Sequence, residues 1–125
     1  MSSERPNILW ICTDQQRYDT IHALGNGHIR TPNLDRLAAE GVAFTRAYSQ
    51  SPICTPSRAS FLTGYYPSTL HVNRNGNEYF PEDIPLITST LADIGYDYGL
   101  VGKLHLSAAN DRVKIRPDDG YRVFK

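Results

Sequence analysis

The sequence predicts an α/β fold in which helices cover both faces of a mostly parallel sheet. Residues 7–13 (NILWICT) form a short, nearly continuous apolar run that is rich in β-branched and aromatic side chains. Such a run is typical of a strand buried on both faces, and strands of this kind belong to parallel sheets covered by helices. Two stretches with helical spacing of apolar residues, 32–40 and 86–94, supply candidate helices, and a further strand candidate follows at 98–101.

The first half of the chain is expected to hold a strand, a helix and a second strand. After the strand at 7–13, Thr31 offers a capping hydroxyl and Pro32 occupies the first helical position. Gly41 is a suitable end for this helix. Residues 42–48 alternate apolar and polar side chains, which predicts the second strand.

A helix over residues 56–63 is expected next. Cys54 would lie at or just before its N-terminus, and Gly64 would end it. Residues 65–85 are rich in Gly, Pro, Asn and Tyr and predict a long ordered loop. Loops of this length inside a domain are usually functional or mobile.

The last elements are a helix and a strand. Pro85 opens the helix and Gly95 ends it, and residues 98–101 form the strand. Residues 111–125 are charged and show no pattern of a helix end or a packed terminus. We expect no domain boundary within residues 1–125, because neither a repeat nor a linker divides them.

Composition excludes several classes of protein. The 13 Lys and Arg residues balance 13 Asp and Glu residues, so the clustered excess of cations that nucleic acids and membrane surfaces require is not evident. The longest apolar run is too short for a membrane span or a secretory signal, which predicts a cytoplasmic protein, or a periplasmic or secreted one whose signal was removed. Two cysteines make no disulfide scaffold, and Cys12 is expected to pack in the core.

Three polar clusters follow predicted elements in the same way. They are Asp14 with Gln15, the segment 54–58, and Lys103 with His105. The carboxyl ends of parallel strands lie at one edge of a sheet, so these clusters are expected to gather there. Together they offer oxygen ligands for a hard cation, a nucleophile and cationic side chains, which suit attack on a tetrahedral oxyanion.

Cys54 and Arg58 form the most informative of these clusters. A nucleophile at a helix N-terminus is close to N–H groups and a macrodipole that favour negative charge. Arg58 lies four residues on, on the same helical face, and can offer a planar fork of donors to an anion. The alternative, that Cys54 is a small buried hydrophobe, fits poorly with such polar neighbours.

The pattern Cys54-x-Pro56-x-Arg58, followed by Ala-Ser-Phe-Leu-Thr-Gly, resembles the signature of the type I, formylglycine-dependent sulfatases of the alkaline-phosphatase-like superfamily. The resemblance covers about residues 6–106, in the order that the family has them. Its further segments are Pro6-Asn7-Ile8 leading to Asp14, Thr31-Pro32-Asn33-Leu34-Asp35 with Leu37, Gly41-Val42-Ala43-Phe44 and Gly102-Lys103-Leu104-His105.

This resemblance implies a sulfuric ester hydrolase with the alkaline-phosphatase-like fold. Cys54 would be oxidised to formylglycine by a formylglycine-generating or sulfatase-maturing enzyme, which would recognise Pro56 and Arg58. The hydrated aldehyde would be the nucleophile, and its second hydroxyl would help to expel sulfate. The substrate would be a sulfate ester of a small molecule or a carbohydrate.

The resemblance also implies one divalent metal ion, usually Ca²⁺ in sulfatases, held by Asp14, Gln15 and the modified Cys54. Gln15 departs from the family's commonest pattern, which has a second aspartate, and so removes one negative charge. This leaves open the identity of the metal ion and the role of Gln15.

The remaining site residues are also given by resemblance. Lys103 would bind the sulfate oxygens, His105 would contact the nucleophile hydroxyl, and Arg58 would orient the nucleophile. In the loop after the nucleophile helix, His71, Asn73 and Arg74 are further candidates for shaping the substrate pocket.

The family's remaining metal ligands and its second Lys and His have no match in this sequence. The chain is therefore expected to be the N-terminal portion of a larger domain and to be inactive alone. Two alternatives stay open: a phosphonate monoester or phosphodiester hydrolase of the same superfamily, and a non-catalytic fragment that lacks the second half of the site.

Overall fold

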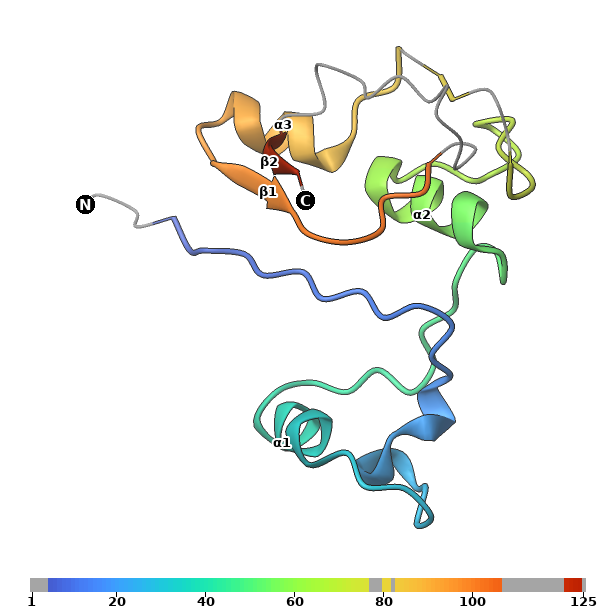
Figure 1. The fold of residues 1–125 in the computed structure, drawn as a ribbon, viewed down its shortest axis with the longest axis vertical. Helices are drawn as coiled ribbons and strands as arrows, with labels where there is room; N and C mark the ends of the chain where they lie inside the picture. Colours follow the sequence, from blue (N-terminus) through green and yellow to red (C-terminus); the bar gives the residue numbers. More distant parts are fainter. Residues whose placement is uncertain (1–4, 77–79, 82, 107–120, 125) are drawn as a thin grey trace. The chain divides into compact units, whose positions relative to one another are not determined.

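The structure is a computed structural model that describes residues 5–76, 80–81, 83–106 and 121–124. The chain forms two compact units, Met1–Ala47 and Tyr48–Lys125 (Figure 1). That residues 1–125 belong to one catalytic domain stays a prediction.

The first unit contains two short 3₁₀-helices and one α-helix. These are η1 (Tyr18–Thr20), η2 (His22–Leu24) and α1 (Pro32–Glu40), and η2 packs against α1. The expected helix is confirmed with Pro32 in its first turn and Gly41 at its end, where the Gly41 N–H donates to the Leu37 carbonyl (3.0 Å). The 3₁₀-helices were not predicted, because elements of three residues are too short to show an apolar period.

A hydrogen-bonded carboxylate joins η2 to α1. Asp35 Oδ1 accepts from the Ala23 N–H (2.9 Å) and from the Thr31 hydroxyl (2.8 Å), and that hydroxyl accepts from the His22 N–H (2.9 Å). Thr31 therefore precedes α1 as expected, but its side chain does not cap the helix backbone. Partial desolvation raises the pKa of Asp35, while the bonds from Ala23 and Thr31 and the nearby His22 lower it; the net result is a pKa below the ordinary value.

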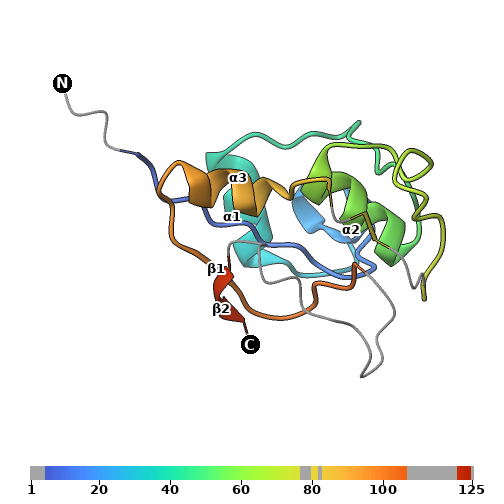
Figure 2. The same cartoon turned by 90° about the horizontal axis from the view of Figure 1, so that it is seen from above.

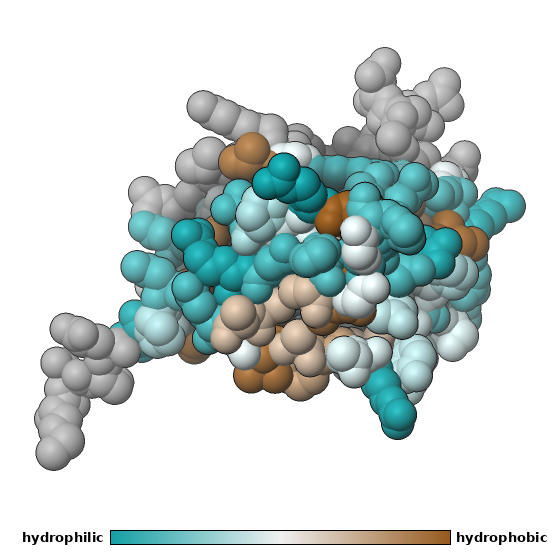
Figure 3. Space-filling model, turned by 90° about the horizontal axis from the view of Figure 1, so that it is seen from below, coloured by the Kyte–Doolittle hydropathy of each residue, from teal (hydrophilic) through white to brown (hydrophobic). Residues whose placement is uncertain are grey.

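The prediction of two strands in the first part of the chain, at 7–13 and 42–48, is wrong. Neither range is a strand, and Ile8, Leu9, Trp10 and Ile11 are between 61 and 84% exposed. Cys12 is exposed too, so its expected place in the core is also wrong. Apolar composition favours burial, but a strand forms only where a neighbour completes its backbone hydrogen bonds. Figure 3 shows brown and tan apolar side chains at the surface in the lower part of the view.

The second unit contains α2 (Cys54–Thr63), α3 (Ile87–Asp93), β1 (Tyr98–Leu100) and β2 (Tyr121–Phe124). Helix α3 packs against both α2 and β1 (Figures 1 and 2). Helix α2 ends as predicted at Gly64, which has a left-handed φ of 76° and whose N–H donates to the Ser60 carbonyl (2.8 Å). Helix α3 begins two residues after Pro85, with Leu86 as its N-cap.

Strands β1 and β2 pair in parallel, with Tyr98 opposite Tyr121 and Leu100 opposite Phe124. The strand at 98–101 is therefore confirmed, apart from its last residue. Strand β2 corrects the prediction that residues 111–125 lack a packed terminus: four residues carry too short a pattern to identify, and only pairing with β1 reveals them. The parallel pairing agrees with the predicted sheet type.

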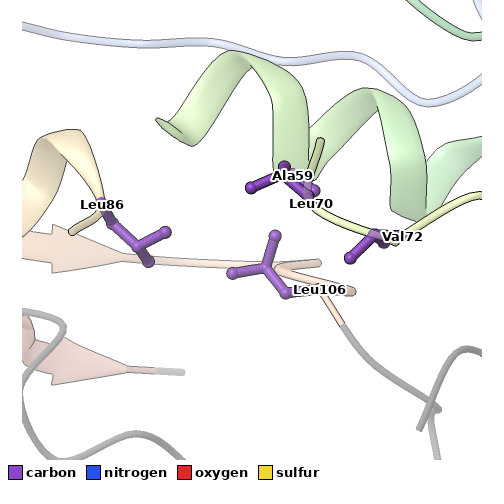
Figure 4. Packing of buried hydrophobic residues seen from close by; sticks show 5 residues of the cluster. All are labelled: Ala59, Leu70, Val72, Leu86 and Leu106. Atoms are coloured by element: carbon purple, nitrogen blue, oxygen red, sulfur yellow. The ribbon is translucent and has the colours of Figure 1, made fainter. Parts of the chain in front are cut away.

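The core of this unit lies between α2, the loop after it, the start of α3 and the segment after β1. It consists of five buried side chains, which Figure 4 labels: Ala59, Leu70, Val72, Leu86 and Leu106. Leu70 and Val72 come from the long loop predicted at 65–85, whose described residues form turns and no helix or strand. The loop is thus anchored to α2 by two fully buried side chains.

None of the helices in the described ranges combines the length and the apolar character that crossing a membrane requires.

Candidate active site

Cys54 is the first residue of α2 and is half-buried. The residue before it, Ile53, is in extended conformation, and its carbonyl accepts from the Ser57 N–H (3.0 Å), which closes the first helical turn. Pro56 fits within this first turn because it has no N–H that would need a partner there. The sequence therefore places the Cys54 side chain where α2 begins, as predicted.

Arg58 and Lys103 meet beside this helix. Arg58 is only 7% exposed, and its Nη1 donates to the main-chain oxygen of Lys103 (2.6 Å). Lys103 is exposed, and its Nζ lies 3.8 Å from Cys54 Sγ. Arg58 thus holds the backbone of the residue whose ammonium group reaches the predicted nucleophile.

His105, two residues after Lys103, is half-buried and has a left-handed φ of 53°. Among the described residues, the others that are not glycine and have such a φ are Gln15 (56°) and His71 (55°). All three are residues that the sequence singled out for the site. Left-handed backbone is uncommon outside glycine and tends to occur at functional sites, where the surrounding structure holds it.

Serine hydroxyls organise the segment that leads into α2. Ser49 Oγ lies 2.9 Å from Ser57 Oγ and donates to the Ser51 carbonyl (2.7 Å), and Ser51 Oγ accepts from the Ile53 N–H (3.1 Å). Sequence reasoning did not identify these residues. The signal was present, because serines directly before a helix commonly bond to nearby backbone groups.

Asn75 makes a longer-range contact with the same helix. Its Oδ1 accepts from the main-chain N–H of Thr55 (2.9 Å), the residue that follows Cys54. Asn75 is 20 residues away in sequence, so no local pattern could have predicted this partner.

A shallow open hollow of about 270 Å³ lies beside Pro56. Asn73 lines it, together with Tyr66 and Ser68 from the loop after α2. His71 and Arg74 do not line this hollow. Of the three loop residues predicted to shape the substrate pocket, Asn73 lines this hollow.

Asp14 and Gln15, the predicted metal ligands, lie in the first unit. A carboxylate and an amide oxygen are hard donors, so their chemistry fits Ca²⁺ or Mg²⁺. A calcium ion takes six to eight oxygen ligands, however. Within the described residues no three His, Cys, Asp or Glu side chains group together in a way that could hold a metal ion. Asp14 and Gln15 therefore supply at most part of a coordination shell.

The second unit by itself brings together a helix N-terminus, a thiol, an ammonium group and a buried guanidinium group. Each of the last two is cationic, and helix N-termini favour anions. The arrangement can stabilise negative charge next to Cys54, as attack on an anionic ester requires.

Comparison with known proteins gives a consistent result. Residues 6–121 match the family model described as Sulfatase. The chain is 42% identical over 102 residues to an ulvan-active sulfatase of Formosa agariphila, covering 82% of this chain and 20% of that protein. It is 40% identical to human steryl-sulfatase over 84% of this chain and 20% of that one.

A solved structure agrees with these relatives. The structure of the sulfatase homologue yidJ from Bacteroides fragilis superposes with a TM-score of 0.72 and 36% identity, over 79% of this chain and 23% of that one. The chain thus spans about a fifth to a quarter of the length of these proteins. Its fold is the N-terminal portion of the alkaline-phosphatase-like α/β fold. The family model covers residues 6–121, which is most of the chain, and the structural match covers 79% of it, so this chain belongs to the sulfatase family.

Proposed function

We propose that the protein containing this chain hydrolyses sulfate esters, with Cys54 as the position of its nucleophile. The observation that carries this proposal is the placement of Lys103 Nζ 3.8 Å from Cys54 Sγ at the start of α2. A sulfate ester carries one negative charge, which an ammonium group and a helix N-terminus both attract.

Each described side chain has a distinct part in this proposal. Lys103 binds the sulfate oxygens and neutralises their charge. Arg58 fixes the Lys103 backbone from a buried position, as its bond to the Lys103 carbonyl indicates. His105 contacts the nucleophile hydroxyl, and its left-handed backbone sets the direction in which its side chain leaves the main chain.

We include in the proposal that a maturing enzyme oxidises Cys54 to formylglycine: the enzyme supplies the oxidant, the C–S bond breaks, and the sulfur leaves as the Cβ atom becomes an aldehyde. When present, the hydrated aldehyde supplies one hydroxyl for attack on sulfur and a second through which sulfate is released. Asp14 and Gln15 would hold a divalent cation, and a hard cation would favour the anionic form of a hydroxyl close to it.

Mass spectrometry tests the modification directly. The longest reading frame that contains this chain is expressed with and without a formylglycine-generating enzyme. The mass of the peptide that contains residue 54 is then measured for both preparations. We expect conversion of thiol to aldehyde, together with hydrolysis of 4-nitrophenyl sulfate. C54A should be inactive and C12A, at the other cysteine, should keep its activity. An unmodified thiol and no sulfatase activity in the coexpressed protein would contradict the proposal.

Gln15 gives a reason to test a second substrate class. An amide in place of a carboxylate leaves the proposed metal site less negative, which changes how strongly the cation attracts the substrate's oxygens. An aryl sulfate, an aryl methylphosphonate and an aryl phosphodiester with the same aryl leaving group should be compared by their kcat/KM values. We expect the sulfate ester to be preferred, and a higher kcat/KM for the phosphonate or the diester would identify the enzyme as a phosphonate monoester or phosphodiester hydrolase.

A further inference from the structure

The first turn of α2 has few backbone N–H groups that need an acceptor from outside the helix. The first N–H groups of a helix have no partner within it. In α2, Pro56 has no N–H, and the Ser57 N–H already bonds to the Ile53 carbonyl. Thr55 is the second residue of the helix, and its N–H also lies in this first turn.

The helix does not cap these donors with its own N-cap residue. Ile53 occupies that position and makes no side-chain cap bond. In most helices a Ser, Thr, Asp or Asn at the N-cap accepts from the second or third helical N–H. Here Asn75 performs that function from a distance, because its Oδ1 accepts from the Thr55 N–H at 2.9 Å.

The loop that carries Asn75 is well anchored. Leu70 and Val72 are fully buried in the core against α2, and the Val72 N–H donates to the Pro67 carbonyl (3.0 Å). Asn75 follows Val72 by three residues, and Gly76, with a left-handed φ of 72°, allows the chain to turn directly after it. The amide oxygen is therefore presented to α2 by a segment held on the same core.

We propose that Asn75 is a positioning residue for the nucleophile: by accepting from the Thr55 N–H, it fixes the first turn of α2 and hence where the residue 54 side chain sits relative to Lys103. This inference rests on the proposed function. It adds to it a residue outside the Cys-x-Pro-x-Arg pattern and links the loop carrying His71, Asn73 and Arg74 to the nucleophile helix.

Three variants of the full reading frame test this role. N75A removes the acceptor, N75D keeps an oxygen of the same reach, and N26A is the matched control. Asn26 is also an asparagine bonded to backbone, since its Nδ2 donates to the Asp19 carbonyl (2.6 Å) and its Oδ1 accepts from the His28 N–H (3.0 Å). It lies in the first unit, away from α2 in the chain.

The kinetic readout separates positioning from binding. We expect N75A to lower kcat on 4-nitrophenyl sulfate about 10- to 100-fold with KM changed less than about threefold, because small displacements of a reacting group cost this much. N75D should recover most of kcat while raising KM, since its carboxylate repels an anionic substrate. N26A should lower the melting temperature and leave kcat unchanged. A kcat of N75A equal to that of N26A would overturn the proposal.

Hydrogen exchange at the Thr55 amide gives a readout that needs no turnover. Measured by mass spectrometry with residue-level fragmentation, exchange at Thr55 should be about five- to tenfold faster in N75A and near the original rate in N75D, as expected for losing one hydrogen bond. Unchanged exchange in N75A would overturn the inference whatever the activity. Faster exchange in a protein that is inactive on sulfate esters would support the contact and contradict the proposed function instead.

Discussion

Arg58 in α2 donates to the main-chain oxygen of Lys103 at 2.6 Å, so an arginine that is only 7% exposed holds the backbone of an exposed lysine. This bond joins two segments that are 45 residues apart in sequence. An arginine side chain has the length and the donor geometry to reach this carbonyl from α2.

Replacing Arg58 should therefore destabilise the second unit. We expect R58K to lower the free energy of unfolding by about 1.5–3 kcal/mol, the usual range for a hydrogen bond to a charged group, because lysine lacks the planar fork of donors. Urea denaturation followed by circular dichroism measures the change. R36K, at an exposed position of α1, is the control and should stay within about 0.5 kcal/mol of the original. Equal effects of the two variants would mean that the Arg58 bond contributes nothing specific.

Lys103 should matter for anion binding and little for stability, because its side chain is exposed. We expect K103M to raise the inhibition constant for inorganic sulfate at least about tenfold, corresponding to loss of roughly 1.4 kcal/mol. The measurement is competitive inhibition, or isothermal titration where activity is too low. R46M removes one exposed cation from the first unit and should leave sulfate affinity unchanged. An unchanged inhibition constant for sulfate in K103M would show that the anion does not bind at Lys103.

Asp35 predicts a pH dependence of stability. Its folded-state pKa lies below the ordinary value of 3.8, through the hydrogen bonds from Ala23 and Thr31. Its charged form is therefore favoured in the folded state, so its contribution is fully present above about pH 4 and is lost as pH falls through the lower, folded pKa. D35N, which keeps an oxygen acceptor but no charge, should be less stable than the original at pH 7, and the difference should shrink toward pH 3.

Thermal unfolding between pH 3 and pH 7 measures this difference. D83N, at an exposed position, serves as the charge-matched control. A gap between D35N and the original that stayed constant across this range would show that the Asp35 charge contributes no stability.

Any side chain at position 64 should strain the backbone and destabilise the protein. It ends α2 with a φ of 76°, and an added Cβ would meet nothing within 4 Å, so steric contact is not an issue. We expect G64A to lower the free energy of unfolding by about 1–2 kcal/mol, the cost of left-handed backbone for a residue with a Cβ. Gly27 also has open space around it but no left-handed φ, so G27A should be neutral. Denaturant titration of both variants decides the point.

Local sequence signals predicted the helices of this chain well. Pro32 and Gly41 bound α1, and Gly64 ends α2, because capping and left-handed glycine depend on neighbours in sequence. The strands at 7–13 and 42–48 failed for the opposite reason. A strand needs a neighbouring strand for its backbone hydrogen bonds, and local composition does not identify that neighbour. The hydrophobicity of Trp10 or Phe44 therefore could not determine whether a sheet forms there.

In the site too, the features that depend on local sequence were predicted and those that depend on long-range contacts were not. Cys54 at a helix start followed from Pro56, and the resemblance gave Lys103 and His105. The bond from Arg58 to the Lys103 carbonyl and the acceptor role of Asn75 depend on contacts 45 and 20 residues apart, which only the folded chain reveals.

The left-handed backbone at Gln15, His71 and His105 has a consequence for engineering this protein. A selection for heat resistance alone would favour glycine at these three positions, since glycine adopts that conformation without strain. Each such change would remove a side chain that the site is proposed to use. Thermostable variants of this protein should therefore be sought away from residues 15, 71 and 105, because glycine there would favour stability and remove a side chain of the proposed site.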